Sequence, residues 1–437
     1  MKVKKIISLI ISLFILLSVT FISGCDNESD FKPVLRFAIA SDVHVKDANS
    51  NVEEARLAKM FDMAYTYSKS SVSYNKLDAV IFAGDFTDLG TLNSMQKFKS
   101  IVDGKVESET KVIVTLGNHE FYTDASNTED RYKTVFNTDV DEHLKINGFH
   151  FIKLSPNGAN FSEEKLTWLE NELEKAVNDT PNKPIYVIQH QHVKGTVYGS
   201  TGWGVSGLYD ILAKYPQVVD FSGHSHFPIQ DERSLWQGDF TAIGTGTLSY
   251  VEMGLNGVST DYVFPFSKDG DYKLWQRTGD SDYGVFQILE CDSKGNMKIL
   301  GYDVTSGEQL FERKIDKVTS KSDLILNTQK AETTPVPEFA NGSKCSYVIE
   351  SNGDVLLTVP KATSNAYIES YRAVVYLENA FIGEFYALSG QIFLPTSTTI
   401  KIRVTGLEKG KNYLIKTYAV NAYNKLSKTP LELQVTV

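Results

Sequence analysis

Short apolar runs rich in Val, Ile and Phe alternate with longer polar stretches from Val34 to about Tyr250. Runs of this kind are typical of buried strands, and polar stretches between them with a helical period indicate an α/β domain. The runs are Val34–Ala40, Leu77–Ala83, Lys111–Leu116, Phe149–Leu154, Ile185–Ile188 and Val218–Phe221.

Two of the intervening stretches carry apolar residues at spacings of three and four, as an amphipathic helix does. The first extends from Leu57 to Ser68. The second follows Ser162, a residue type that caps helix N-termini, with Glu163 and Glu164 in the expected first turn. We expect both helices to cover a sheet.

The pattern changes after Tyr250. Residues 251–282 are rich in Gly, Asp and aromatic residues without a clear period, and Tyr262, Phe264, Phe266 and Trp275 there could form a lid or a small core. Tyr283–Glu290 and Met297–Val304 predict a hairpin at the edge of a first domain that spans residues 34–316.

The remaining residues predict a linker and a second domain. Residues 317–339 are rich in Lys, Ser, Thr and Pro, as linkers are. Residues 340–437 carry Val/Tyr/Thr-rich strands with turns about every ten residues, which predicts an all-β sandwich of immunoglobulin or fibronectin III type. Leu407, Gly410 and Tyr413 resemble the tyrosine corner of fibronectin type III modules.

The N-terminus carries an export signal. Lys2, Lys4 and Lys5 precede an uncharged run over residues 6–24, which predicts a signal peptide at residues 1–24. The run ends Ile-Ser-Gly-Cys25, which resembles a bacterial lipobox and predicts lipidation of Cys25, with residues 25–33 as a tether. The protein would then be attached to the outer face of the cell membrane as a lipoprotein. The alternative is an uncleaved membrane anchor.

Length and charge narrow the classes of function. The chain has 437 residues, enough for two or three domains, and its net charge of −10 argues against a nucleic acid polymer as partner. An apolar content of 42% excludes a mostly disordered chain. Cys291 and Cys345 fall in different predicted domains, so we expect free, buried thiols.

Polar residues with metal-binding side chains follow the carboxyl ends of the predicted strands. Strand ends of this kind line one crevice in α/β folds, so the residues are expected to converge. Carboxylate, imidazole and amide oxygen donors suit a pair of metal ions, and no Cys is among them. The clusters are Asp42-Val-His44, Gly84-Asp85, Gly117-Asn118-His119-Glu120, His190 and Gly223-His224-Ser-His226.

These clusters resemble the ordered signature of the calcineurin-like metallophosphoesterase family: D-x-H, G-D, G-N-H-[DE], H and G-H-x-H. The resemblance implies a core of two packed mixed β-sheets flanked by helices, with two metal ions that could be Mn, Fe or Zn. It implies that one ion is bound by Asp42, His44, Asp85 and His226, and the other by Asp85, Asn118, His190 and His224. His119 would contact the phosphoryl group and protonate the leaving oxygen.

One block departs from the family pattern. Many relatives have His-His-Pro where this chain has His190-Gln191-His192-Val193. Alignment on the preceding strand favours His190 as the ligand, with His192 as the alternative. The loop Lys194–Gly207 then follows, and its Tyr198 and Trp203 either pack on their own domain or stack a flat group such as a nucleobase.

The resemblance implies a phosphoric ester hydrolase, a monoesterase or diesterase that uses a metal-bridged hydroxide. An exported protein would act on an extracytoplasmic phosphodiester, phosphomonoester or nucleotide. The alternative is a cell-surface binding protein, in which the β-sandwich contacts cell wall, glycan or protein and the α/β unit is a non-catalytic scaffold.

Overall fold

The computed structural model describes residues 31–48, 50–254, 275–277, 283–390 and 398–437. The predicted signal peptide, the lipidation site Cys25 and the aromatic residues Tyr262, Phe264 and Phe266 lie outside the described residues, as does the side chain of Trp275. Within the described ranges, no helix combines the length and apolar character needed to cross a bilayer.

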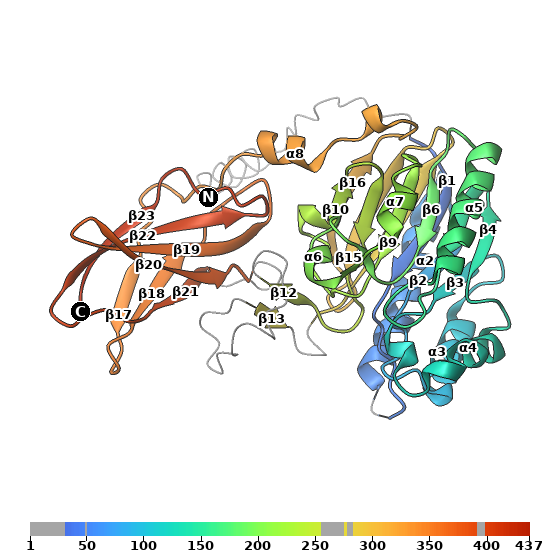
Figure 1. The fold of residues 1–437 in the computed structure, drawn as a ribbon, viewed down its shortest axis with the longest axis horizontal. Helices are drawn as coiled ribbons and strands as arrows, with labels where there is room; N and C mark the ends of the chain where they lie inside the picture. The colour runs from blue at the N-terminus through green and yellow to red at the C-terminus, as the bar shows by residue number, and fades with distance from the viewer. Residues whose placement is uncertain (1–30, 49, 255–274, 278–282, 391–397) are drawn as a thin grey trace, which may run out of the picture. The chain divides into compact units, whose positions relative to one another are not determined.

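Two six-stranded mixed sheets form the core of the first part of the chain (Figure 1). The first has the order β16-β15-β14-β1-β2-β3, from β1 (Pro33–Ala40), β2 (Ala79–Ala83), β3 (Lys111–Thr115), β14 (Val285–Asp292), β15 (Met297–Asp303) and β16 (Gln309–Ile315). The second has the order β10-β11-β9-β6-β5-β4, from β4 (Glu142–Ile146), β5 (Phe149–Lys153), β6 (Ile185–Ile188), β9 (Val218–Ser222), β10 (Leu235–Gln237) and β11 (Thr241–Gly244).

The sheets pack face to face because alternate residues of their strands are apolar on the inner side. Phe37 of β1 contacts Phe151 of β5 and Phe221 of β9, with ring centroids 5.4 and 5.9 Å apart. The next residue of β1, Ala38, belongs to a separate cluster on the outer face. All six strands predicted from the apolar runs are present, and most of their residues are buried.

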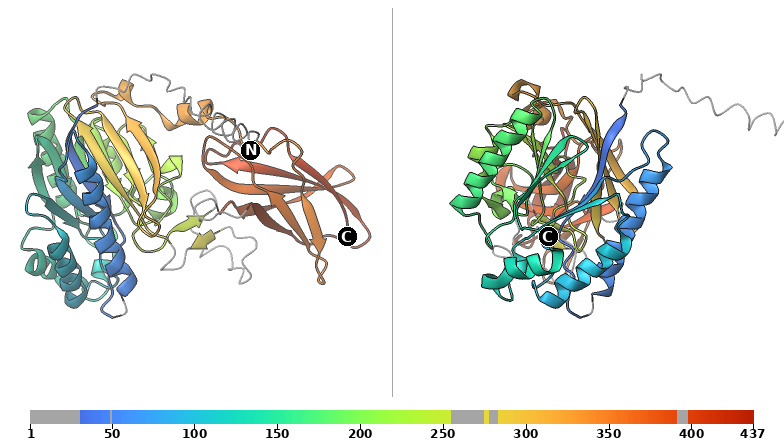
Figure 2. Two further views of the ribbon diagram at one scale, coloured as in Figure 1. Left: turned by 180° about the vertical axis from the view of Figure 1, so that it is seen from behind. Right: turned by 90° about the vertical axis from the view of Figure 1, so that its right-hand side faces the viewer.

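Helices cover the outer faces of both sheets (Figure 2). The helix predicted from Leu57 to Ser68 is part of α2 (Asn51–Ser70), and the helix predicted after Ser162 is α5 (Glu163–Asp179). The Ser162 side chain accepts a hydrogen bond from the Lys165 amide, as a helix cap does. The other helices of this part are α3 (Leu92–Lys105), α4 (Thr128–Phe136), α6 (Ser200–Trp203) and α7 (Leu208–Leu212).

The predicted hairpin exists as β14 and β15, and it lies inside the first sheet rather than at an edge of that sheet. Strand β14 pairs antiparallel with β1 inside the sheet, and β16 forms that edge. Every residue of β14 is buried, whereas β16 alternates between exposed and covered residues. The hairpin is interior because both faces of β14 are packed.

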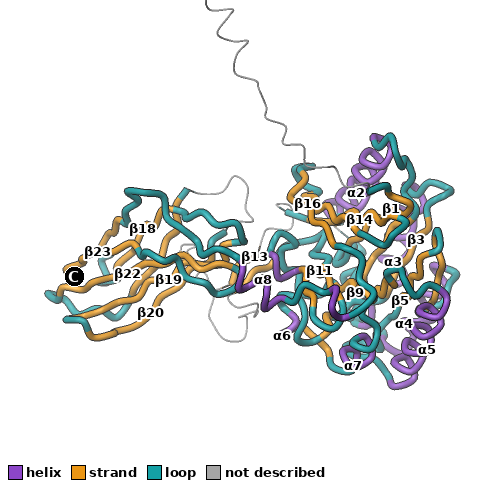
Figure 3. The backbone as a smooth tube through the Cα atoms, turned by 90° about the horizontal axis from the view of Figure 1, so that it is seen from above, coloured by secondary structure: helices purple, strands orange, loops and turns teal. Residues whose placement is uncertain are grey.

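The C-terminal part consists mostly of strands (Figure 3). One sheet contains β17 (Ser346–Ile349), β18 (Val355–Pro360) and β21 (Thr399–Val404), and the other contains β20 (Ala380–Leu388), β19 (Ile368–Leu377), β22 (Asn412–Asn421) and β23 (Leu431–Thr436). Their apolar residues share one core cluster. The preceding segment, expected to be a linker, contains the short helix α8 (Asn327–Thr333).

Short strands complete the description. They are β7 (His192–Val193) with β8 (Gly204–Val205), and β12 (Glu252–Gly254) with β13 (Trp275–Arg277). Cys291 and Cys345 are both free, as expected; Cys291 is buried and Cys345 is only half-buried.

Candidate metal centre

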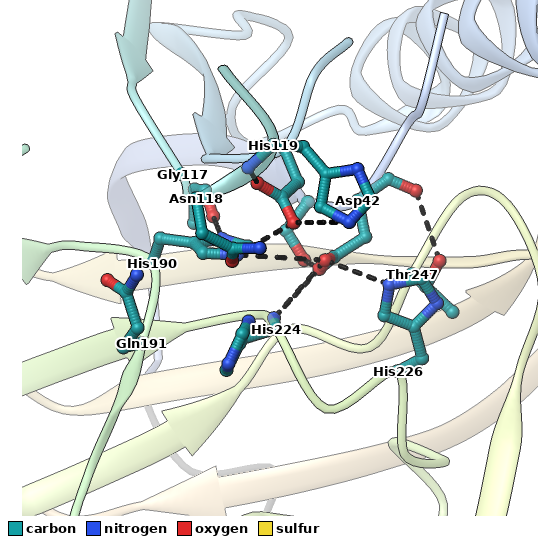
Figure 4. Close-up of polar contacts among 12 residues, drawn as sticks. Asp42, Gly117, Asn118, His119, His190, Gln191, His224, His226 and Thr247 are labelled. Carbon is teal, nitrogen blue, oxygen red and sulfur yellow. Dashed lines mark hydrogen bonds and ion pairs between the residues drawn. The ribbon is translucent and has the colours of Figure 1, made fainter. Parts of the chain in front are cut away.

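The loops that follow five parallel strands bring the predicted site residues together (Figure 4). Asp42 Oδ1 lies 3.0 Å from His226 Nε2, and Asp85 Oδ2 lies 3.0 Å from His190 Nε2. Two groups of donors form around these pairs, each with its ligand atoms within 4.8 Å of one another. They are Asp42 with His44 and His226, and Asp85 with His190 and His224.

Asn118 completes the cluster through its side-chain amide. Its Nδ2 donates to the Tyr122 hydroxyl at 2.9 Å, which leaves Oδ1 facing His190 Nε2 at 3.2 Å. His119 lies at the rim, with its Nε2 atom 3.9 Å from Asp85 Oδ2 and its side chain 24% exposed. It is only partly buried, so it can contact a bound substrate.

The backbone at the centre is strained. Five of the ten non-glycine residues described with positive φ are site residues, namely Asp42, His44, Asp85, His224 and His226. Their φ values lie between 48° and 72°, the left-handed region that side chains usually avoid. Strain of this kind persists where the surrounding structure fixes it, and it is concentrated at functional sites.

Two of the motif glycines are required by space. A Cβ atom on Gly84 would lie 2.5 Å from the His190 ring, and one on Gly117 would lie 2.2 Å from Asp85 Oδ1. Gly84 also has a φ of 82°. Because any side chain at these positions would displace the cluster, both glycines allow the loops to approach it closely.

Backbone carbonyls fix the tautomer of three histidines of the cluster. The Nδ1 atoms of His190, His226 and His119 each contact a backbone carbonyl, at 2.8, 2.9 and 2.7 Å. A carbonyl can only accept, so Nδ1 carries the proton, and in the neutral ring Nε2 presents its lone pair to the cluster. His44 Nε2 and His226 Nε2 are only 3.2 Å apart. A metal ion bound by both Nε2 atoms, or a proton shared between them, would satisfy this contact, and the donor types of the cluster fit metal ions.

The charges of the buried groups also favour metal ions at the centre. Burial raises the pKa of Asp42, but His226 and His190 outweigh it and bring the pKa to about 2. Asp85 likewise has its pKa lowered, because His190 outweighs the effect of burial. Burial and the nearby His190 lower the pKa of His224 to about 3. The centre thus holds two buried carboxylates that require neighbouring positive charge.

His192, the alternative to His190, is not part of the cluster. Its Nδ1 atom lies 2.8 Å from Ser222 Oγ and its Nε2 atom lies 2.7 Å from Ser225 Oγ, so hydroxyls engage both ring nitrogens. The other two histidines, His143 and His150, contact each other at 2.8 Å on the β4–β5 hairpin. The structure therefore brings His190 rather than His192 to the centre.

Glu120 supports the centre, a role that sequence reasoning missed. Its buried carboxylate accepts four hydrogen bonds, from the backbone amides of Asp85, Thr87 and Gly117 and from the Thr87 hydroxyl, at 2.7 to 3.1 Å. The carboxylate thereby joins the loops after β2 and β3. The acidic fourth position of the G-N-H-[DE] block was the available signal.

The two aromatic residues of the loop Lys194–Gly207 lie in different surroundings. Tyr198 is buried in the domain, with its ring 4.7 Å from that of Phe227 and with the Arg233 guanidinium 3.8 Å from its centroid. Trp203 instead meets His224 edge to face, with the ring centroids 5.3 Å apart. Packing on the domain was thus correct for Tyr198, whereas Trp203 lies at the centre.

Residues 35–228, which include all of the candidate metal ligands and His119, match the calcineurin-like phosphoesterase family. They form a calcineurin-like phosphoesterase domain. A phosphoesterase domain with these donor clusters implies that the protein binds divalent metal ions.

A curated protein is similar to part of this chain. A curated relative from Arcobacter nitrofigilis, named probable glycerophosphodiester phosphodiesterase GpdQ, is 30% identical over 166 residues. The alignment covers 35% of this chain and 57% of the relative, so the chain spans little more than half of that protein.

Solved structures with similar chains are more distant. A purple acid phosphatase from yellow lupin (Lupinus luteus) seeds is 13% identical, with a TM-score of 0.43 over 64% of this chain and 53% of that chain. A phosphatase from Mycoplasma pneumoniae is also 13% identical, with a TM-score of 0.32 over 68% of this chain and 96% of that chain.

Proposed function

We propose that this protein is a metal-dependent hydrolase of phosphate esters that acts outside the cytoplasm. The observation that carries the proposal is the convergence of Asp42, Asp85, Asn118 and four histidines from five strand ends within the phosphoesterase domain. A scaffold without activity has no need for strained backbone and buried carboxylates at one point.

We assign the ligands of two metal ions as the family signature implies. Asp42, His44, Asp85 and His226 would hold one ion, and Asp85, Asn118, His190 and His224 the other, with Asp85 shared. Bound divalent ions would lower the pKa of water and withdraw charge from the phosphoryl group. Their identity as Mn, Fe or Zn is a matter for metal analysis.

The protein's own contribution to the chemistry is orientation and proton transfer. The Asp88 carbonyl holds Nδ1–H of His119 at 2.7 Å, and the Asp85 carboxylate accepts the His119 backbone N–H at 2.9 Å. The ring is thereby fixed with Nε2 as its free atom. In its protonated form, Nε2 donates to a phosphoryl oxygen and gives its proton to the leaving alcohol.

A preference for diesters is supported by the relative named as a glycerophosphodiester phosphodiesterase. Hydrolysis of bis(p-nitrophenyl) phosphate and p-nitrophenyl phosphate by the metal-loaded protein tests both activity and preference. The Asp85→Asn variant should lose turnover together with at least one equivalent of bound metal. A non-catalytic surface scaffold would give no turnover in the unmodified protein, and full activity in Asp85→Asn would exclude the shared ligand.

We also propose export and lipidation at Cys25, supported by the basic start and the uncharged run of residues 6–24. Labelling with a palmitate analogue, followed by cell fractionation, tests this: a Cys25→Ser variant should lose the label. If the unlabelled variant stays in the membrane fraction, the segment is an uncleaved anchor.

The C-terminal sandwich is proposed to be of fibronectin III type and to contact cell wall, glycan or protein. Its tyrosine corner supports the class, because the Glu408 amide donates to the Tyr413 hydroxyl at 2.8 Å, a bond from the ring to upstream backbone. Pull-down of purified cell walls by residues 340–437 tests the binding role.

A further inference from the structure

A cleft of about 370 Å³ opens beside the metal centre and shares Asn118 and His224 with it. Three aromatic side chains line the cleft. Phe121 and Tyr122 follow Asn118 in the loop after β3, and Trp203 ends α6. A substituent of a phosphoryl group held at the centre would therefore extend directly into this cleft.

The cleft is almost free of charge. Its described lining contains no Lys, Arg, Asp or Glu, and the residues not yet named are Gly158, Ala159, Gln191, Gly202, Gly204 and Val205. A second phosphate group is usually met by Arg or Lys, and a primary ammonium by a carboxylate. The lining therefore favours a neutral group, and its aromatic rings favour a flat one.

Two buried polar atoms in this lining have no hydrogen-bond partner among the described residues, namely Gln191 Oε1 and Trp203 Nε1. Gln191 is 2% exposed, and its Nε2 donates to the Gly158 carbonyl at 3.1 Å. That bond fixes the amide orientation, so the unpaired end is the oxygen. Figure 4 shows Gln191 next to His190 in the centre.

An unpaired acceptor and an unpaired donor are costly when buried. A ligand with one donor and one acceptor on a flat ring would pair both after a small rotation of the two side chains. A quaternary ammonium group would suit the aromatic rings but would leave both atoms unpaired, and so would an alkyl chain. A nucleobase combines the flat face with a donor and an acceptor on its edge.

We propose, on the basis of the phosphodiesterase activity proposed above, that this cleft binds the nucleoside substituent of a phosphodiester. The base stacks against Trp203, and a donor on its edge hydrogen-bonds to Gln191 Oε1. Specificity for nucleoside esters thus resides in the loop Lys194–Gly207 and in the residue that follows His190.

Three chromogenic diesters with the same leaving group test the proposal. They are thymidine 5′-(p-nitrophenyl phosphate), methyl p-nitrophenyl phosphate and p-nitrophenylphosphorylcholine. We expect kcat/KM to be at least roughly tenfold higher for the thymidine ester than for the other two, the range of one base stacked on an aromatic ring. Equal values, or a preference for the choline ester, would overturn the proposal.

Variants of Trp203 test whether this side chain stacks on the base. Trp203→Leu should lower the ratio of kcat/KM between the thymidine and methyl esters by roughly 5- to 100-fold, and Trp203→Phe should have an intermediate ratio. The matched control is Trp168→Leu, because Trp168 is half-buried in α5 and does not line this cleft. A ratio unchanged in Trp203→Leu would contradict the stacking role.

Binding without turnover separates this proposal from the proposed function. If the metal-loaded protein hydrolyses all three diesters equally, the phosphoesterase stands and the nucleoside site fails. If it hydrolyses none, the proposed function fails. Calorimetric titration of the metal-free protein with thymidine then tests whether the cleft binds a nucleoside. Binding that Trp203→Leu weakens supports the cleft proposal, and absence of binding overturns it.

Discussion

Asp42, Asp85 and His226 hold left-handed backbone although none of them is a glycine. Each such conformation costs roughly 1–3 kcal/mol, so hydrogen bonds around the loops must offset that cost. Glu120 supplies four of them to the loops after β2 and β3. At the scale of single residues, Glu120 therefore helps to position the proposed metal ligands, although it is not one of them.

Glu120→Gln tests this dependence. Its amide NH₂ would face backbone donors and could not accept from them, so we expect a loss of roughly 10- to 100-fold in metal affinity or kcat/KM, as for other outer-shell partners. Metal titration and steady-state kinetics measure it. Glu164→Gln on the exposed face of α5 is the control. Unchanged metal affinity and unchanged kinetics in Glu120→Gln would exclude the positioning role.

His119→Ala addresses proton transfer. We expect the bound metal content to stay unchanged and kcat to fall by roughly 10²–10⁴, the range of a general acid. The loss should be larger for an alkyl leaving group than for p-nitrophenol, because a poor leaving group needs the proton more. Metal analysis and kinetics with the two ester types measure this, and equal losses would contradict the acid role.

At the scale of elements, β9 carries a buried carboxyl in the middle of a sheet. Asp220 is fully buried, and the Gln189 amide donates to both of its oxygens at 3.3 Å. Burial raises the pKa of Asp220 from 3.8 to about 7. The folded protein thus binds this proton more tightly than the unfolded chain, so the contribution to stability is full below pH 4 and is lost as the pH rises to about 7.

Asp220→Asn should remove this pH dependence, because an amide resembles the protonated carboxyl in shape and carries no charge. Relative to the unmodified protein, the variant should gain about 2–3 kcal/mol of stability between pH 5 and pH 8. Urea unfolding of both proteins at the two pH values, with chelator present to exclude metal effects, measures the gain. If the free energy of unfolding changed with pH by the same amount in both proteins, a raised pKa of Asp220 would be contradicted.

The pattern of elements was predictable where it is local. Strands such as Ile185–Ile188 and the helix after Ser162 follow from periodicity and a cap within a few residues. The interior position of β14 could not be predicted, because the sequence pattern of a buried strand does not show which strands it pairs with in the sheet.

At the scale of the whole phosphoesterase domain, the metal centre joins the two sheets. Asp42, Asp85 and Asn118 follow strands of the first sheet, whereas His190 and His226 follow strands of the second. Ions bound between them would connect layers that otherwise meet through apolar packing. Metal binding should therefore stabilise the fold as well as supply activity.

Removal of metal tests this link. Dialysis against chelator should lower the Tm of the domain, and metal at 100 times its Kd should restore about 2.7 kcal/mol of stability. Calorimetry measures the change in the unmodified protein, and Asp85→Asn should respond less. A Tm that does not depend on metal would show that the sheets do not need the ions.

The sequence by itself determined six core strands, the β14–β15 hairpin, two covering helices and the strand-end positions of every proposed ligand, because these depend on neighbouring residues along the chain. Only the tertiary structure decided between His190 and His192, gave Glu120 its four donors and brought Trp203 beside His224. These contacts mostly join residues that are 20 or more positions apart, and they arise from how the layers and loops pack.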